Sequence, residues 1–194
     1  AFARPMLESL DDAAARGRSW DLSSLRLVLS SGVMFSAPLK QRLLDHHRCT
    51  IVDTLGSSEG TGMGRQVTSR SRNDRGTARF VLGGHTRVFA EDGQEVRPGS
   101  GERGRLALGH PLPEGYFKDP AKTEATFPTI GGRRWSVPGD WATVEADGSI
   151  VLLGRGSECI NTGGEKVYPE EVEEALKVHP AVADCNVVGV HDKR

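Results

Sequence analysis

The sequence predicts an α/β fold that combines a partial parallel-sheet βαβ subdomain, an antiparallel β-hairpin or barrel-like subdomain, and the start of a small α+β domain. Two patterns carry this prediction. Near the N-terminus, apolar residues at helical spacing separate two short apolar runs, which is the strand–helix–strand pattern of a parallel crossover. Farther along, short alternating runs flank Asp-Gly pairs, which is typical of antiparallel hairpins.

The N-terminal part is expected to hold a helix over 4–16, a strand over 25–29, a second helix that begins near Ser36, and a strand over 50–52. In a parallel sheet, ligand-binding loops lie at the carboxyl ends of the strands. We therefore expect one such loop after each of the two strands.

The middle part predicts two hairpins and one helix. The first hairpin joins 87–89 to 95–96 and the second joins 142–144 to 150–153, each across an Asp-Gly turn. A short helix is predicted over 119–127, because Asp at a cap followed by Pro is a helix-start signal.

The C-terminal part predicts a helix that starts at Pro169, with acidic residues in its first turn and Lys177 in its last. A strand is expected over 183–190. We divide the chain into a large-domain portion over 1–154 and a hinge with the start of a small domain over 155–194.

Composition excludes several classes of function. The net charge is -1 and the basic residues form no clustered surplus, so nucleic-acid binding is not expected. Three cysteines form no close pair, which favours a reducing compartment and argues against a Cys-x-x-Cys zinc site. The sequence has no run of about 18 apolar residues that could span a membrane. We expect a cytoplasmic protein and, because the chain begins with Ala1, a segment of a longer one.

The segment 53–60 is the sharpest candidate site, because it places Ser58 and Glu59 together after a predicted strand. Hydroxyls and backbone N–H groups can hold phosphate, and a carboxylate can hold Mg²⁺ that bridges phosphate oxygens. The glycine-rich run 60–64 lacks the lysine of a phosphate-binding loop and is interpreted as a flexible turn.

Two later segments add candidates. Asp140 follows a tight turn, where a carboxylate can accept both hydroxyls of a ribose, although Asp is also common in turns as scaffolding. The paired glycines Gly163 and Gly164 precede the predicted C-terminal helix, which suggests that another backbone or a ligand approaches closely there.

Taken together over 25–194, these segments resemble the superfamily of acyl-CoA synthetases, luciferases and peptide-synthetase adenylation domains. Segment 31–38 is similar to the family's Gly-Gly-Ala-Pro loop, and 55–59 to its Tyr-Gly-x-Thr-Glu motif. Segment 135–140 resembles the stretch that ends in Thr-Gly-Asp. Segment 154–173 resembles the Gly-Arg hinge with its following Gly-Gly and Pro-x-Glu-x-Glu, and it is the most specific match.

The resemblance implies that Glu59 binds Mg²⁺ and that Ser58 contacts phosphate in place of the usual Thr, which makes these two the catalytic candidates. It implies that Asp53 meets the adenine amino group. Leu55 and Gly56 would belong to the same nucleotide site, with Leu55 standing where an aromatic ring often stacks on adenine.

The remaining site residues are also implied by the resemblance. Asp140 would hold the ribose hydroxyls, with Arg155 nearby. Gly163 and Gly164 would line the thiol-acceptor tunnel after the small domain rotates, and Ser157 would mark the hinge.

Departures from the family pattern refine the expectation. Bulky apolar residues at 33–35 replace small ones in the wall of the acyl pocket, so a hydrophobic, fatty-acid-like carboxylate is expected. The upstream loop that ends in Lys and the downstream catalytic Lys have no counterpart within the 194 residues. This chain by itself is therefore expected to be inactive.

The expected function is part of an ATP-dependent acyl-CoA synthetase, in which residues 1–154 form the C-terminal portion of the large AMP-binding domain. With ATP and Mg²⁺, such an enzyme forms an acyl-adenylate and then transfers the acyl group to coenzyme A, releasing AMP. Two alternatives stay open: an adenylation module that loads a carrier protein, and a non-catalytic nucleotide-binding or interaction fragment of the same fold.

Overall fold

The computed structural model describes residues 3–32, 35–71, 78–156, 159–162, 166–177, 179 and 181–190. The elements, in chain order, are α1 (Ala3–Ala15), β1 (Leu27–Ser31), α2 (Ala37–His46), β2 (Thr50–Ser57), β3 (Gly60–Thr68), β4 (Arg79–Leu82), β5 (Thr86–Phe89), β6 (Arg103–Leu108), α3 (Pro120–Thr126), β7 (Thr129–Ile130), β8 (Arg133–Arg134), β9 (Asp140–Val144), β10 (Ile150–Arg155), β11 (Ile160–Asn161), β12 (Lys166–Val167) and α4 (Pro169–Lys177).

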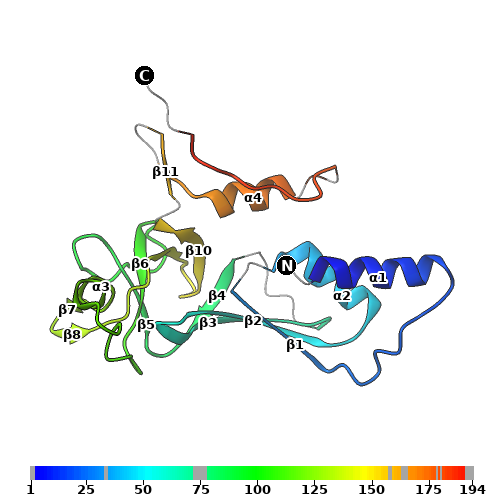
Figure 1. Ribbon diagram of the computed structural model, residues 1–194, viewed down its shortest axis with the longest axis horizontal. Helices are drawn as coiled ribbons and strands as arrows, with labels where there is room; N and C mark the ends of the chain where they lie inside the picture. Colours follow the sequence, from blue (N-terminus) through cyan, green and yellow to red (C-terminus); the bar gives the residue numbers. More distant parts are fainter. Residues whose placement is uncertain are drawn as a thin grey trace.

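An eight-stranded sheet dominates the fold, in the order β1-β2-β3-β4-β10-β9-β6-β5 (Figure 1). Strands β1 and β2 are parallel and are joined through α2, which confirms the predicted βαβ unit. The described pairings from β2 onward in this sheet are antiparallel. The two subdomains that we predicted as separate therefore share one hydrogen-bonded sheet, because β3 and β4 connect them.

Helices α1 and α2 lie side by side against the β1–β2 end of the sheet (Figure 1). Their apolar faces form a core with β2 that includes Leu7, Leu10, Leu43 and Ile51. Each of these side chains is at most 8% exposed. The amphipathic pattern of the two helices is thus explained by this single contact face.

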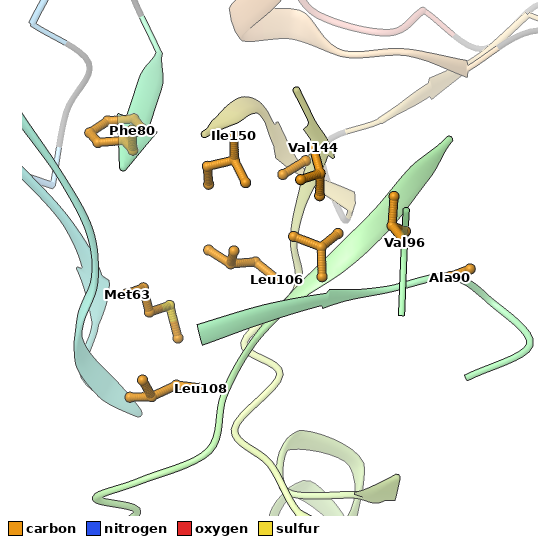
Figure 2. Close-up of a cluster of buried hydrophobic side chains, with 10 residues drawn as sticks. Met63, Phe80, Ala90, Val96, Leu106, Leu108, Val144 and Ile150 are labelled. Atoms are coloured by element: carbon orange, nitrogen blue, oxygen red, sulfur yellow. The ribbon is translucent and has the colours of Figure 1, made fainter. Parts of the chain in front are cut away.

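A second core lies where the sheet curves, so that β3 meets β6. Figure 2 shows Met63 of β3 beside Leu108 of β6, and Leu106, Val144 and Ile150 are among the other members of the cluster. Gly60 allows this close contact, because a Cβ atom there would lie 2.6 Å from Leu108 Cδ2 and the leucine side chain would have to shift. The curvature places the turn between β2 and β3 near the loop that follows β6.

Several local predictions are confirmed. The β9–β10 hairpin turns at Gly148, whose φ of 78° suits glycine. Helix α3 is capped by Asp119, whose Oδ1 accepts a hydrogen bond from the Lys122 N–H at 2.9 Å. Helix α4 begins at Pro169 as expected.

Two predictions in the region of β2 and β3 are wrong. The expected loop after Val52 and the expected flexible turn at 60–64 are strands β2 and β3, which pair with each other up to Ser57 and Gly60. The first predicted hairpin does form as a short ladder, in which the Val96 N–H donates to the Val88 carbonyl at 2.9 Å and Phe89 bridges Glu95, while β5 also pairs with β6.

The expected strand over 183–190 is irregular in the structure. The backbone N–H of Val187 donates instead to Glu173 Oε1 on α4 at 2.8 Å, and Cys185 Sγ donates to the Glu173 carbonyl at 3.4 Å. Helix α4 therefore satisfies polar groups that a strand would direct to a neighbouring strand. None of the helices in the described ranges is both long and apolar enough to cross a membrane.

Candidate functional site

Glu59 lies at the two-residue turn between β2 and β3, where its carboxylate accepts hydrogen bonds from two hydroxyl groups. The Tyr116 hydroxyl donates to Glu59 Oε1 at 2.5 Å, and Ser58 Oγ donates to Oε2 at 3.0 Å. The Glu59 backbone N–H donates to Ser57 Oγ at 3.3 Å. The hydrogen bond from Tyr116, chiefly, lowers the pKa of Glu59 to about 2 against the opposing effect of burial, so the side chain is ionised at neutral pH.

Tyr116 is a member of this site that the sequence did not predict. It belongs to the loop between β6 and α3, and its backbone N–H donates to Thr123 Oγ1 at 2.9 Å. The ammonium of Lys122 lies 4.1 Å from the centre of its ring. The available sequence signal was its position in a Gly-Tyr pair just before the Asp119 helix cap.

Asp140 and Arg155 form the second part of the site. They lie opposite each other on β9 and β10, and Arg155 Nε is 3.6 Å from Asp140 Oδ1. The Asp140 side chain is 11% exposed, whereas that of Arg155 is 54% exposed. Gly154, with a φ of 115° beside the irregular step after Leu152, lets the strand bend before Arg155.

Tyr116 and Arg155 bring the two parts together. Burial raises the pKa of the Tyr116 hydroxyl, its hydrogen bond to Glu59 raises it further, and the positive charge of Arg155 opposes both. Arg155 is therefore close enough to Tyr116 for an electrostatic effect. The Glu59–Tyr116 contact and the Asp140–Arg155 pair, whose carboxylates are 81 positions apart in the sequence, therefore lie within electrostatic range of each other.

The other predicted residues of β2 are more enclosed. Asp53 is buried in mid-strand, and its Oδ2 accepts a hydrogen bond from Lys40 Nζ at 3.1 Å. Leu55 packs against the curved core. Gly56 lies close to the partner strand, because a Cβ atom there would be 3.2 Å from the Gly60 carbonyl oxygen.

Some predicted positions fall outside the described residues: Ser157, Gly163, Gly164, Val33 and Met34. Their neighbour Phe35 is described and is 6% exposed, packed in the core between α1, α2 and β2. Phe35 therefore contributes to this core and not to an open acyl pocket.

A magnesium ion fits the chemistry of Glu59. The described part of the chain contains no group of three or more His, Cys, Asp or Glu side chains that could enclose a metal. Mg²⁺, however, usually binds through one or two carboxylates together with substrate phosphates and water. An ionised carboxylate flanked by two serine hydroxyls, Ser57 and Ser58, meets that requirement.

No protein-family model matches the chain. The chain is 49% identical over 195 residues to the medium/long-chain-fatty-acid–CoA/3-oxocholest-4-en-26-oate–CoA ligase of Mycolicibacterium smegmatis. The matched region is 100% of this chain and 35% of that protein. The 3-oxocholest-4-en-26-oate–CoA ligase of Rhodococcus rhodochrous is 47% identical over 196 residues, again with 100% of this chain and 35% of that protein covered.

The chain belongs to the acyl-CoA ligases of the adenylate-forming superfamily. Among solved structures, this ligase segment is similar to the O-succinylbenzoate coenzyme A synthetase of Bacillus subtilis in complex with ATP and magnesium ion. The TM-score is 0.73 at 27% identity, with 97% of this chain and 38% of the other covered. The segment spans about 35% of the length of the curated relatives it matches.

Proposed function

We propose that this acyl-CoA ligase segment supplies a large part of the nucleotide site of an AMP-forming acid–thiol ligase. The observation that carries the proposal is that Glu59, hydrogen-bonded to Tyr116, and Asp140, paired with Arg155, lie within electrostatic range of each other. One carboxylate would hold phosphate-bound Mg²⁺ and the other would hold a ribose. A scaffold alone does not require two neighbouring carboxylates, each with its own polar or charged partner.

The proposed reaction has two half-reactions. An oxygen of the substrate carboxylate attacks the α-phosphorus of ATP, and the bond to pyrophosphate breaks to give an acyl-adenylate. The thiol of coenzyme A, losing its proton, then attacks the acyl carbon, and AMP leaves. We propose a hydrophobic acid as substrate, because the relatives are named for fatty acids and a steroid acid.

Glu59 and Ser58 would act on the phosphate side of the site. The Glu59 carboxylate, which accepts hydrogen bonds from Tyr116 and Ser58, is ionised at neutral pH and would bind Mg²⁺. When bound, Mg²⁺ would supply electrostatic stabilisation of the phosphate oxygens. The Ser58 hydroxyl, on an exposed turn, would contact phosphate directly.

Asp140 and Arg155 would act on the ribose side. The Asp140 carboxylate is mostly buried and is oriented by Arg155, so it can accept hydrogen bonds from ribose hydroxyls in a fixed geometry. Toward the base, Asp53 would meet the adenine amino group, and Leu55 and Gly56 would belong to the same surface.

The thiol-transfer elements complete the proposal. We propose that Gly163 and Gly164 line the path of the coenzyme A thiol and that the chain rotates near Ser157 between the half-reactions, with residues 155–194 starting the moving domain. The cytoplasm is the proposed compartment, because three free cysteines fit a reducing environment.

A chimaera tests this function. The segment replaces its counterpart in the Mycolicibacterium smegmatis relative, and ATP–pyrophosphate exchange is measured with a fatty acid. We expect exchange by the chimaera and a loss on the order of 100-fold or more in Glu59→Gln and in Asp140→Asn. Asp147→Asn is the matched control, because Asp147 lies on an exposed turn of the β9–β10 hairpin. Wild-type exchange in both site variants, or none in a folded chimaera, would refute the proposal.

A further inference from the structure

A buried charged cluster lies beneath the hairpin that carries Glu59. Lys40 of α2 donates from Nζ to Asp53 Oδ2 on β2 at 3.1 Å and also to Gln66 Oε1 on β3. The side chains of Lys40 and Asp53 are 3% and 5% exposed. Asp53 and Gln66 face each other in the strand register, so one ammonium group joins the helix to both strands of the hairpin.

Stability alone does not explain this cluster. Removing two charges from water is unfavourable, and well-packed apolar residues in place of a buried ion pair are often equally or more stabilising. The surroundings are apolar: the Phe35 ring centre is 5.7 Å from Lys40 Nζ, and Ile51 and Leu43 belong to the adjoining core. A purely structural position here would be satisfied by an apolar side chain. Buried charges at this position are therefore consistent with a role beyond stability.

The position of the cluster indicates which interaction this is. Asp53 precedes Ser57 by four residues along β2, which is roughly 13 Å at about 3.3 Å per residue. Ser58 and Glu59 follow at the turn. The buried cluster at the middle of β2 and the proposed phosphate site at its end thus have a separation that an extended nucleotide can bridge.

We propose that Lys40 is a positioning residue for nucleotide binding, which fixes the Asp53 carboxylate and the β2–β3 hairpin at the base end of the site. This inference rests on the proposed function. A carboxylate accepts hydrogen bonds and cannot donate while ionised. Held by Lys40, Asp53 would accept from the amino group of adenine and would disfavour guanine, which carries a carbonyl oxygen at the corresponding position.

The test compares three variants in the chimaera, by calorimetric titration with AMP and by steady-state kinetics with ATP and GTP. In Lys40→Met we expect AMP affinity to fall by about tenfold or more, KM for ATP to rise more than kcat falls, and the preference for ATP over GTP to shrink. Lys40→Arg keeps the charge and should restore part of the affinity. Leu43→Ala, on the same helix, should lower Tm while leaving AMP affinity within about twofold.

The outcomes separate this inference from the proposed function. If Lys40→Met lowers Tm as Leu43→Ala does but binds AMP with wild-type affinity, the inference is wrong and the proposed function stands. If the unsubstituted chimaera does not bind AMP, both are overturned. If Lys40→Met does not fold, the double variant Lys40→Met/Asp53→Asn removes the uncompensated charge, and wild-type AMP affinity in that variant would equally overturn the inference.

Discussion

Tyr116→Phe is the most informative single change at the site, because it removes one hydroxyl and little else. The hydroxyl donates to Glu59 Oε1 at 2.5 Å. The ring would keep its place 6.1 Å from the Phe127 ring centre and its contact with the Lys122 ammonium at 4.1 Å. Any change in the titration of Glu59 can then be assigned to the lost hydrogen bond.

The size of the effect follows from the hydrogen bond. The pKa of Glu59 is about 2 instead of the ordinary 4.5, and the bond from Tyr116 is the largest cause. A hydrogen bond to a charged group contributes about 1.5–3 kcal/mol net, and each pH unit corresponds to about 1.4 kcal/mol. The pKa of Glu59 should therefore rise by about one to two pH units in Tyr116→Phe. Since Glu59 is partly exposed, the lower end is expected.

The sign of the pH dependence is fixed by the direction of the shift. A carboxylate with a lowered pKa in the folded state stabilises the fold above its unfolded pKa, near 4.5, and loses that contribution as the pH falls toward about 2. In Tyr116→Phe the contribution is smaller throughout. The difference in free energy of unfolding between the two proteins should thus be largest above pH 4.5 and should shrink in acid.

The assay is a ¹³C NMR titration of side-chain carboxyl groups between about pH 3 and 6. Glu59→Gln identifies the signal of Glu59, which should remain in its ionised position down to the lowest pH in the wild type and begin to move in Tyr116→Phe. Tyr168→Phe, at the second of the chain's two tyrosines, is the matched control. An unchanged Glu59 titration in Tyr116→Phe would show that Tyr116 does not set the charge of the site.

Two further predictions concern catalysis. The 194-residue chain alone should produce no acyl-CoA from fatty acid, ATP and coenzyme A, because neither lysine-bearing family element occurs within it. Clear turnover in a preparation free of longer ligase would contradict this prediction. In the chimaera, Ser157→Pro should keep much of the adenylate formation but lose most thioester formation, because proline fixes φ near the proposed hinge. Equal loss or equal retention of both half-reactions would show that residue 157 is not the hinge.

The parts of the fold that local chemistry determines were predictable from sequence. The Asp119 cap with its following proline predicted α3, and the turn at Gly148 predicted the β9–β10 hairpin. Helical periodicity between two apolar runs predicted the parallel pair of β1 and β2. In each case, the residues that make the decisive contacts lie within a few positions of one another or repeat at a fixed period.

The β2–β3 hairpin was not predictable in the same way. Its glycine-rich strand lacks the side-chain alternation of a half-buried strand, so 60–64 was interpreted as a turn. The glycines instead allow close contacts across the sheet: a Cβ atom at Gly64 would lie 3.1 Å from Phe80 Cβ, and one at Gly60 would meet Leu108. Those partners come from β4 and β6, which are distant in the sequence, so no local sequence pattern predicts these contacts.

The same reasoning separates the two kinds of residue in the site. Glu59 and Asp140, the groups proposed to contact ligand, lie in contiguous motifs and were found from sequence. Tyr116 lowers the pKa of Glu59 from 57 positions away, and Lys40 reaches Asp53 and Gln66 from a helix whose pattern gave no reason to bury a lysine. Sequence motifs therefore identify the residues proposed to contact the nucleotide. The residues that shift their pKa values or fix their orientation are brought to them by tertiary folding, so they can be identified only from the structure.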